Sequence, residues 1–402
     1  MTTQAILGLD VAQAGVAFQL QRFTGPALAT GRAAATSAGW AELTAVLTDH
    51  HLTWPETLVV IEATGQWHLP WCEAASAAGA TVLALNPLIA RRVTAVGNAI
   101  RDQKSDPIDA AGLTETGARY AAELTRFTYR SQPGRFGLRR LLSVRADVRT
   151  ALTNLRKSAG DLQGLCFPEL ADTGLSADRR RDVLRVAAAP AAVAALDEKV
   201  LRPLAAKYTD AVRAAARSSF APAALTAAAA PALQALLHSD EALAQQLAAL
   251  DRQISAAAAT ALDADQLQRA ATLPGFGART TPAILACIPP ELFTHHRSHR
   301  ARANALQALF GCEPRLRTSG QWTGKIKMSK RGIREARTAL YQAAFCALAH
   351  DPEIKAYYDA LRARGKEHKS ALVDVMRKLL RRLVAVLDPA VPTPSQKQPC
   401  AA

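Results

Sequence analysis

The stretch Ala5–Leu20, AILGLDVAQAGVAFQL, decides the fold class of the first part of this chain. Two apolar runs, Ala5–Asp10 and Val16–Leu20, flank the turn-like AQAG. Short apolar runs separated by such a turn predict a β-hairpin, and its first strand ends on Asp10. The next strand-like run along the chain is Thr57–Glu62, TLVVIE, which also ends on an acid.

Helical patterns surround these strands. Trp40–Leu47 has helical periodicity, Trp67–Ala78 predicts a second helix, and Gly79 leads into a further strand, Thr81–Asn86. The stretch from residue 87 to residue 120 is helical in pattern, with an interruption near Asp102–Pro107. Strands placed early and then alternating with helices predict an α/β domain with a mixed sheet.

Beyond this domain, leucines recur at a three–four spacing. Arg145 is a charged residue within this apolar pattern. The spacing predicts coiled-coil arms. The seam residues are Leu138, Leu141, Val148, Leu152, Leu155, Leu162 and, further on, Leu243, Leu247, Leu250 and Ile254. The two leucine seams could pack against each other within one chain, as a helical pair, or form a contact between subunits. The Ala-rich stretch between them predicts helices with breaks, and the breaks are expected at Pro190, Pro203, Pro222 and Pro231.

A third, mainly helical unit begins near Leu273. Its LPGFGARTTPAILACI contains a Gly-x-Gly turn between short helices, which is either a phosphate-gripping loop or a plain tight turn. The last residues, PAVPTPSQKQPCAA, predict a disordered tail. Four segments result: a first domain (1–130), a helical coiled-coil or linker region (131–264), a C-terminal domain (265–388) and the tail (389–402).

Positive charge is concentrated in the last third of the chain. Residues 275–402 hold 22 Lys/Arg against 9 Asp/Glu, whereas residues 1–130 hold 9 against 11. Such an excess is typical of proteins that bind nucleic acid, because neutralising phosphates releases counterions. A solvated helix face is the plainer alternative. A membrane surface is a less favoured partner, because neither end of the chain has the pattern of a basic amphipathic helix.

Sequence composition also indicates the cellular compartment of the protein. The sequence has no apolar run of membrane-spanning length and no signal-peptide pattern at its start. Its six cysteines are scattered without any CxxC, which favours reduced, buried thiols over a zinc site or a disulfide framework. We therefore expect a cytoplasmic protein.

Four carboxylates of the first domain form a candidate metal site. Asp10 and Glu62 end predicted strands, and Asp106 and Asp109 open a predicted helix at positions i and i+3, on one helix face. Hard divalent cations prefer several oxygen ligands, and two-metal phosphoryl transfer needs acids that converge from separate elements. Each acid also has a structural alternative: Asp106 could cap its helix and Asp109 could be a solvated first-turn acid. Asp102 lies in the same polar turn and is a decoy.

The motifs that carry these acids resemble a known family. GLDVAQ, VVIEATGQW, LNP and KSDPIDA occur in the order and spacing of the DEDD transposases of the IS110 insertion-sequence family, relatives of the Piv-type DNA invertases. The second half is similar too, through LPGFGARTTPAIL and the MSKRG motif within GCEPRLRTSGQWTGKIKMSKRGIREARTALY. The resemblance covers roughly residues 5–120 and 265–385.

The resemblance implies a ribonuclease-H-like, RuvC-like first domain in which Asp10, Glu62, Asp106 and Asp109 bind Mg²⁺ or Mn²⁺. It implies a C-terminal transposase domain with a serine nucleophile in PRLRTSG, which indicates Ser319. Thr318 and Ser329 are the nearest decoys. A serine hydroxyl needs a base or a metal to become a good nucleophile, so Ser319 would act beside the metal site of another domain or subunit.

Lysines and arginines near both motifs are candidates for holding nucleic-acid phosphates, which positions the strands without reading their sequence. They are Arg91, Arg92, Arg101, Lys104, Arg315, Arg317, Lys325, Lys327, Lys330, Arg331 and Arg334. His295, His296 and His299 lack acidic or cysteine partners in the sequence, and we assign them to a polar loop rather than to a metal.

Partners follow from the same resemblance: donor and target DNA, a structured guide (bridge) RNA, and a homodimer that assembles into a tetramer through the helical arms. In prokaryotes such a protein acts at the nucleoid. Two other functions fit the residues. A metal-dependent junction-resolving nuclease would use the acids with water as nucleophile, and a non-enzymatic nucleic-acid-binding protein would not cut at all.

Overall fold

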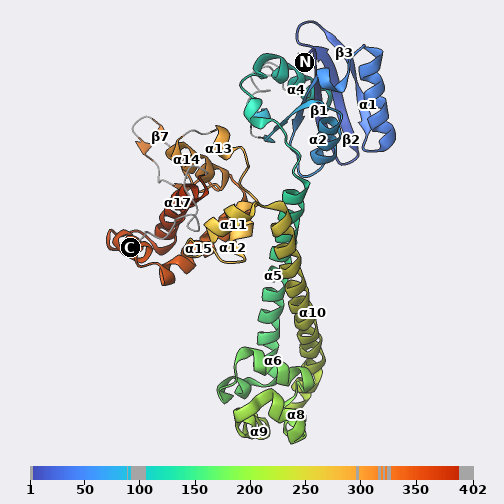
Figure 1. Cartoon of the computed structure of the whole chain (residues 1–402). Coiled ribbons are helices and arrows are strands. Elements are labelled where there is room, and N and C mark those ends of the chain that lie inside the picture. Colours follow the sequence, from blue (N-terminus) through green and yellow to red (C-terminus); the bar gives the residue numbers. More distant parts are fainter. Residues whose placement is uncertain are drawn as a thin grey trace. The chain divides into compact units, whose positions relative to one another are not determined.

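The computed structural model describes residues 3–87, 89–91, 106–295, 298–315, 318–319, 322–323 and 327–388. Its contacts divide the chain into two units, Met1–Gln132 and Pro133–Ala402 (Figure 1).

A five-stranded mixed sheet forms the centre of the first unit (Figure 1). Its strands in chain order are β1 (Ala5–Ala12), β2 (Gly15–Arg22), β3 (Ala27–Ala34), β4 (Thr57–Glu62) and β5 (Thr81–Leu85). The spatial order is β3-β2-β1-β4-β5; β1, β2 and β3 pair antiparallel, and β4 is parallel to both β1 and β5. The predicted hairpin and mixed sheet are confirmed. The sequence did not predict β3, and β1 continues past Asp10 to Ala12, so Asp10 lies inside its strand.

Helices cover both faces of this sheet. Alternate residues of β1 and β4, such as Leu9 and Ile61, pack on one face with α1 (Ser37–Asp49) and α2 (His68–Ala77). The intervening residues, such as Ile6 and Val60, pack on the other face with α4 (Asp106–Tyr120). The short 3-10 helices are η1 (Trp54–Glu56) and η2 (Thr125–Phe127). The predicted interruption near Asp102–Pro107 lies mostly outside the described residues.

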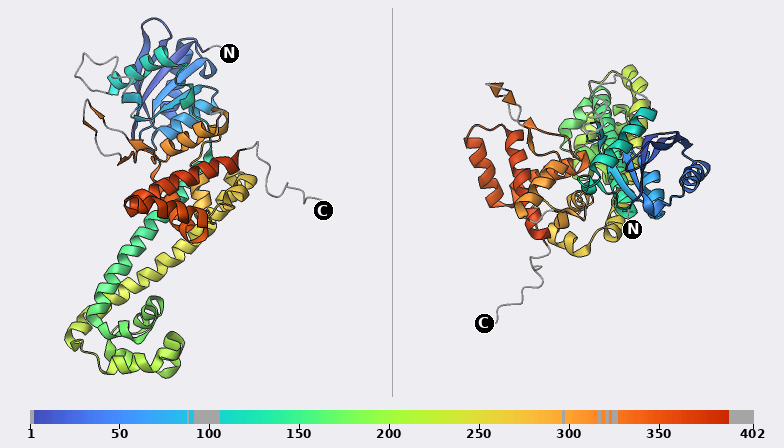
Figure 2. Two further views of the ribbon diagram at one scale, coloured as in Figure 1. Left: turned by 90° about the vertical axis from the view of Figure 1, so that its left-hand side faces the viewer. Right: turned by 90° about the horizontal axis from the view of Figure 1, so that it is seen from above.

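The second unit begins with two long helices, α5 (Pro133–Cys166) and α10 (Ala223–Ala261), that pack against each other within the chain (Figures 1 and 2). They run antiparallel, because Arg145 contacts Asp251 whereas Arg156, further along α5, contacts Asp240. Of the two alternatives for the leucine seams, the structure therefore has the intrachain helical pair.

Charged layers interrupt the apolar seam of this helical pair. Arg145, the intruder of the sequence pattern, donates to the carboxylate of Asp251, which also lies 3.3 Å from Nη2 of Arg279. The Arg145 hydrogen bond and the nearby positive charges lower the pKa of the Asp251 carboxyl. Polar layers of this kind fix the register of paired helices.

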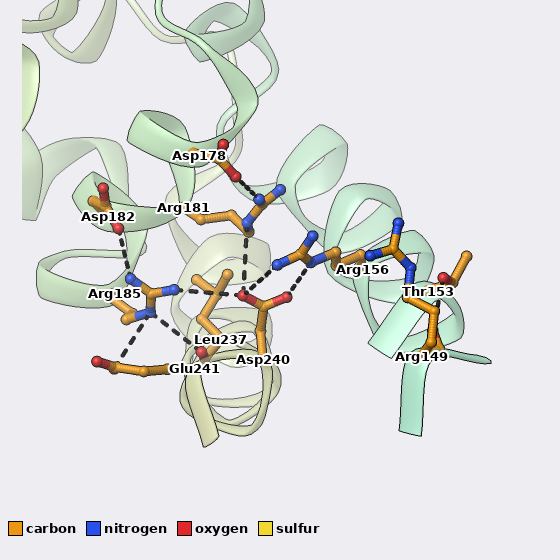
Figure 3. A network of polar contacts seen from close by, with 10 residues as sticks. All are labelled: Arg149, Thr153, Arg156, Asp178, Arg181, Asp182, Arg185, Leu237, Asp240 and Glu241. Atoms are coloured by element: carbon orange, nitrogen blue, oxygen red, sulfur yellow. Dashed lines mark hydrogen bonds and ion pairs between the residues drawn. The ribbon is translucent and has the colours of Figure 1, made fainter. Parts of the chain in front are cut away.

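The second layer is a network of polar contacts around Asp240 (Figure 3). The side chain of Asp240 is 3% exposed and accepts from Arg156, while Arg181 and Arg185 lie 3.7 and 3.5 Å from its Oδ2. Both of these arginines come from α6 (Ala177–Val186), so this layer ties α6 to the helical pair. Asp182 and Glu241 are further ion-pair partners of Arg185.

Short helices connect the far ends of α5 and α10. They are η3 (Pro168–Thr173), α6 (Ala177–Val186), α7 (Pro190–Ala194), α8 (Glu198–Ala205), η4 (Ala206–Tyr208) and α9 (Thr209–Arg217). Pro190 begins α7 and Pro222 precedes α10, as expected of helix breaks. The breaks predicted at Pro203 and Pro231 are wrong, since these prolines lie inside α8 and α10. Burial of neighbours such as Leu233 offsets the lost hydrogen bond at Pro231.

The remaining helices share one apolar core. They are α11 (Ala264–Ala271), α12 (Thr280–Leu285), α13 (Leu292–His295), α14 (His299–Leu309), α15 (Arg334–His350), α16 (Pro352–Ala363) and α17 (His368–Leu387). The expected Gly-x-Gly turn lies between α11 and α12. The predicted disordered tail is outside the described residues.

Among the described cysteines, Cys72, Cys166, Cys287 and Cys312 are buried. Burial raises the pKa of the Cys72 thiol to about 12, so this thiol stays protonated. Cys346 is exposed on α15, which corrects the expectation that the thiols are buried. None of the helices in the described ranges is both long enough and apolar enough to cross a membrane.

Candidate active site

Asp10 and Glu62 occupy neighbouring positions on adjacent parallel strands. The register pairs Leu9 of β1 with Ile61 of β4, and both side chains belong to the face covered by α1 and α2. Side chains alternate between the faces of a sheet, so Asp10 and Glu62, each one residue further, share the opposite face. Both residues are half-buried.

Helix α4 crosses the same face, and two glycines allow it to approach closely. A Cβ on Gly8 would lie 2.3 Å from the carbonyl oxygen of Ala110 and 2.3 Å from Oγ1 of Thr114. A Cβ on Gly117 would lie 2.8 Å from methyl groups of Ile6 and Val60. Glycine inside a strand often marks such a close approach.

These contacts also give the direction of α4. Gly117 lies over Ile6, whereas the earlier residues Ala110 and Thr114 lie over Gly8. The first turn of α4 therefore extends toward Asp10, the next residue on this face of β1. Thr114 fixes the helix further by donating to the carbonyl oxygen of Gln19 on β2, 3.1 Å away.

Asp106 and Asp109 both lie in this first turn, as the sequence predicted. Asp109 is half-buried. The positive end of the helix dipole favours negative charge at these positions. No three His, Cys, Asp or Glu side chains form a metal-binding group within the described residues, and the side chain of Asp106 is not among them.

Ser319 belongs to a different structure, a small β-ribbon of the second unit. Its strands are β6 (Pro314–Arg315), β7 (Thr318–Ser319), β8 (Trp322–Thr323) and β9 (Lys327–Met328). β6 pairs with β9 at the base, and β7 pairs with β8, so that Ser319 faces Trp322 in the register.

The base of this ribbon is held by the GCEP and MSKRG motifs. Lys330 donates its backbone N–H to the carbonyl oxygen of Gly311, and Ser329 donates its own to that of Glu313, both over 3.0 Å. A Cβ on Gly332 would lie 2.1 Å from the carbonyl oxygen of Leu309, so the two segments touch through their backbones. The Oγ of the decoy Ser329 is buried in this base without a hydrogen-bond partner among the described atoms.

Two family models match the two parts of the chain that carry these features. The DEDD transposase model of the IS110 type matches residues 7–162, which include Asp10, Glu62, Asp106 and Asp109. The model of the transposase IS116/IS110/IS902 family matches residues 267–359, which include the ribbon with Ser319. This chain belongs to the IS110 transposase family.

Two curated relatives are products of insertion elements. The 42 kDa protein of insertion element IS900 of Mycobacterium paratuberculosis is 30% identical over 149 residues, 36% of this chain and 36% of that protein. The 43.6 kDa protein of insertion element IS110 of Streptomyces coelicolor is 31% identical over 144 residues, 36% of this chain and 33% of that protein. The chain thus aligns with about a third of the length of each of these family members.

The predicted phosphate-binding residues of this family member fall into three groups. Arg91, which follows β5, is exposed, as are Lys330, Arg331 and Arg334 at the start of α15. Arg315 and Lys327 are register partners at the ribbon base. Arg92, Arg101, Lys104, Arg317 and Lys325 lie outside the described residues.

The histidines differ from the expected polar loop. His295 ends α13 and His299 begins α14, because Ser298 caps that helix by accepting from the backbone N–H of Ala301. His296 lies outside the described residues.

Sequence reasoning missed Asn86 and Gly8. Glu62 pairs with Leu85 of β5, so Asn86 follows at the same edge, where the three parallel strands end. The LNP motif and the glycine within the first strand pattern were the available signals. Asn86 is exposed there, one residue past Leu85, the register partner of Glu62.

Proposed function

We propose that this chain is a DNA transposase that cuts and rejoins strands with two half-sites: the acids Asp10, Glu62, Asp106 and Asp109, and the hydroxyl of Ser319. One observation carries the proposal. Asp10 and Glu62 are neighbours on parallel strands, beneath the first turn of α4, which carries the other two acids. Membership of the IS110 family supports it.

The first unit would be a ribonuclease-H-like, RuvC-like domain. The strand order β3-β2-β1-β4-β5, with one antiparallel meander and two parallel crossovers, supports this assignment. In such a domain the carboxyl ends of the parallel strands frame the site.

The carboxylates suit Mg²⁺ or Mn²⁺, which prefer hard oxygen ligands. Asp10, Glu62, Asp106 and Asp109 would hold the ion, with Asn86 at the same edge. The chemistry that the bound ion supplies is neutralisation of phosphate charge and stabilisation of the leaving oxygen. The close packing at Gly8 keeps the helix and strand acids at a fixed separation, which such a site requires.

Ser319 would form the covalent link. Its Oγ attacks the phosphorus, an O–P bond forms, and the bond from phosphorus to the deoxyribose oxygen breaks. The hydroxyl proton passes to a base, and the released deoxyribose oxygen takes up a proton. The phosphodiester energy is kept in the phosphoserine, so a deoxyribose hydroxyl can later reverse the step and rejoin the strand.

The partners would be donor and target DNA together with a structured guide RNA, which assigns the choice of sequence to base pairing. A homodimer assembling into a tetramer would bring the acids of one subunit to Ser319 of another. The cations Arg91, Lys330, Arg331 and Arg334 would contact backbone phosphates at the cytoplasmic nucleoid.

The test uses the full chain with Mg²⁺, the RNA transcribed beside its gene, and DNA spanning the element ends. A covalent protein–DNA adduct that resists denaturing electrophoresis is expected with the wild type and is expected to disappear in Ser319→Ala. Ser329→Ala is the matched control and should retain the adduct.

Unchanged cleavage by Ser319→Ala, with hydrolysed ends and no adduct, would instead identify the chain as a nuclease that uses water. Salt-sensitive binding without cleavage under Mg²⁺ or Mn²⁺ would identify a binding protein.

A further inference from the structure

A basic cavity is lined by residues of three helices of the C-terminal core, α14, α16 and α17. None of its lining residues belongs to the β-ribbon. Its volume is about 400 Å³. It is lined by His299 of α14, Tyr357 of α16, and Lys378, Arg381, Arg382 and Ala385 of α17. The four residues of α17 follow an i, i+3, i+4, i+7 spacing, which places them on one helix face.

Two acids at the start of α16 fix two of the cations. Lys378 donates to Oε1 of Glu353 over 2.7 Å, and Arg382 donates to both Asp351 and Glu353. These bonds lower the pKa of the Glu353 carboxyl, the Lys378 bond most, so the acid stays ionised. The ammonium of Lys378 also lies 4.7 Å from the centroid of the Tyr357 ring. Lys378 and Arg382 are thus held in place before any ligand arrives.

Arg381 is the third cation of the cavity and is differently placed. It is exposed, and no acidic side chain in the described part of the chain pairs with its guanidinium. His299 contacts the backbone carbonyl oxygen of Arg381 through Nε2 at 3.0 Å and lines the same cavity. Arg300, next along α14, is exposed as well. Lys378, Arg381 and Arg382 therefore give the cavity three positive charges against the two acids at the start of α16, Asp351 and Glu353.

This combination suits a phosphodiester. Fixed cations reduce the entropy lost when an anion binds, an unpaired guanidinium donates to phosphate oxygens in a planar fork, and an aromatic ring beside them can contact a sugar or base. We propose that the cavity formed by His299, Tyr357, Lys378, Arg381 and Arg382 binds the sugar-phosphate backbone of a nucleic acid. The proposal rests on the nucleic-acid-binding part of the proposed function and adds a site separate from the ribbon.

The experiment measures the affinity of the full chain for a 20-base-pair duplex DNA of arbitrary sequence and for an RNA hairpin, over a series of salt concentrations. Arg381→Ala is compared with Lys369→Ala, which removes the same charge from an exposed position of α17 on the opposite side of the helix. Removing one phosphate contact is expected to lower the slope of log affinity against log salt by about 1 and to weaken binding several-fold. Lys369→Ala should leave both unchanged.

The two nucleic acids separate the sources of the phosphate: a loss confined to one arm identifies DNA or RNA as the ligand of this site. If the wild type binds and Arg381→Ala and Lys369→Ala change the affinity equally, this inference alone would be overturned. A wild type that binds neither nucleic acid would overturn the proposed function as well. Equal melting temperatures of the variants exclude misfolding as the cause.

Discussion

The sheet of the first unit and the helical pair of the second both carry carboxylates below the surface, but the two sets are arranged differently. Asp240 and Asp251 of α10 each meet arginines, three around the first and two around the second. Asp10 and Glu62 occupy neighbouring positions on the parallel strands β1 and β4. The first arrangement neutralises charge within the chain and stabilises the fold. The second gathers like charges, which suits a site that binds a cation.

The largest expected effect concerns activity at the sheet. Asp10→Asn should lower Mg²⁺-dependent strand cleavage on the order of 10³-fold, since metal-assisted charge stabilisation contributes several kcal/mol. Because the substitution also removes a like charge beside Glu62, the metal-free free energy of unfolding should change by less than about 1 kcal/mol. Cleavage assays and urea denaturation measure the two quantities. A loss of stability without a loss of cleavage would contradict the comparison.

The buried layer of the helical pair should behave in the opposite way. Asp240→Ala leaves Arg156, Arg181 and Arg185 without their shared acid and should cost about 3–5 kcal/mol of unfolding free energy. Urea denaturation followed by helical circular dichroism checks this value. Asp147→Ala, on the exposed face of α5, is the matched control and should be nearly neutral.

A third prediction separates the packing of the candidate active site from its charge. Gly8→Ala should destabilise the first unit by about 1–3 kcal/mol, because the added methyl collides with α4. It should also weaken Mg²⁺ binding, since the first turn of α4 must move away from Asp10. The control is Gly137→Ala in α5, where a Cβ meets nothing within 4 Å. That change should stabilise by about 0.5–1 kcal/mol, and similar losses at both glycines would refute the close-packing argument.

The smallest effect is expected at the more exposed layer. Asp251→Asn should cost about 1.5 kcal/mol near neutral pH, at the lower end for hydrogen bonds to charged groups. The folded pKa of Asp251 lies below the ordinary value of 3.8, so its contribution is complete above that value and is lost as the pH falls through the folded pKa. The difference between wild type and variant should therefore shrink below about pH 4. A difference that stays constant down to pH 2 would show that the ion pair is not its source.

Local pattern was sufficient for much of the first unit. The hairpin, β4, β5 and the start of α4 at Asp106 followed from apolar runs and helix signals. β3 was missed because its ALATGRAA is mostly exposed and does not alternate in hydrophobicity. It is held by backbone pairing with β2, which leaves little trace in side-chain pattern.

Long-range partners explain the other differences. Arg145 looked out of place in an apolar seam because its acid, Asp251, lies on another helix. The pairing of Asp10 with Glu62 depends on strand register, which the two isolated strand patterns do not specify. Ser319 was singled out through a family resemblance, and it stays a prediction.

The spacing of the two charged layers has a consequence for how this helical pair can change length. Arg145 and Arg156 are eleven residues apart, and so are Asp240 and Asp251. Eleven residues are close to three helical turns and about 16 Å of rise. Matched deletions of eleven residues from both helices would keep every remaining side chain on its original face and leave one layer intact. The arm is therefore modular: its length can be shortened or extended in matched steps, whereas an insertion between the layers in one helix alone would put one layer out of register with the other.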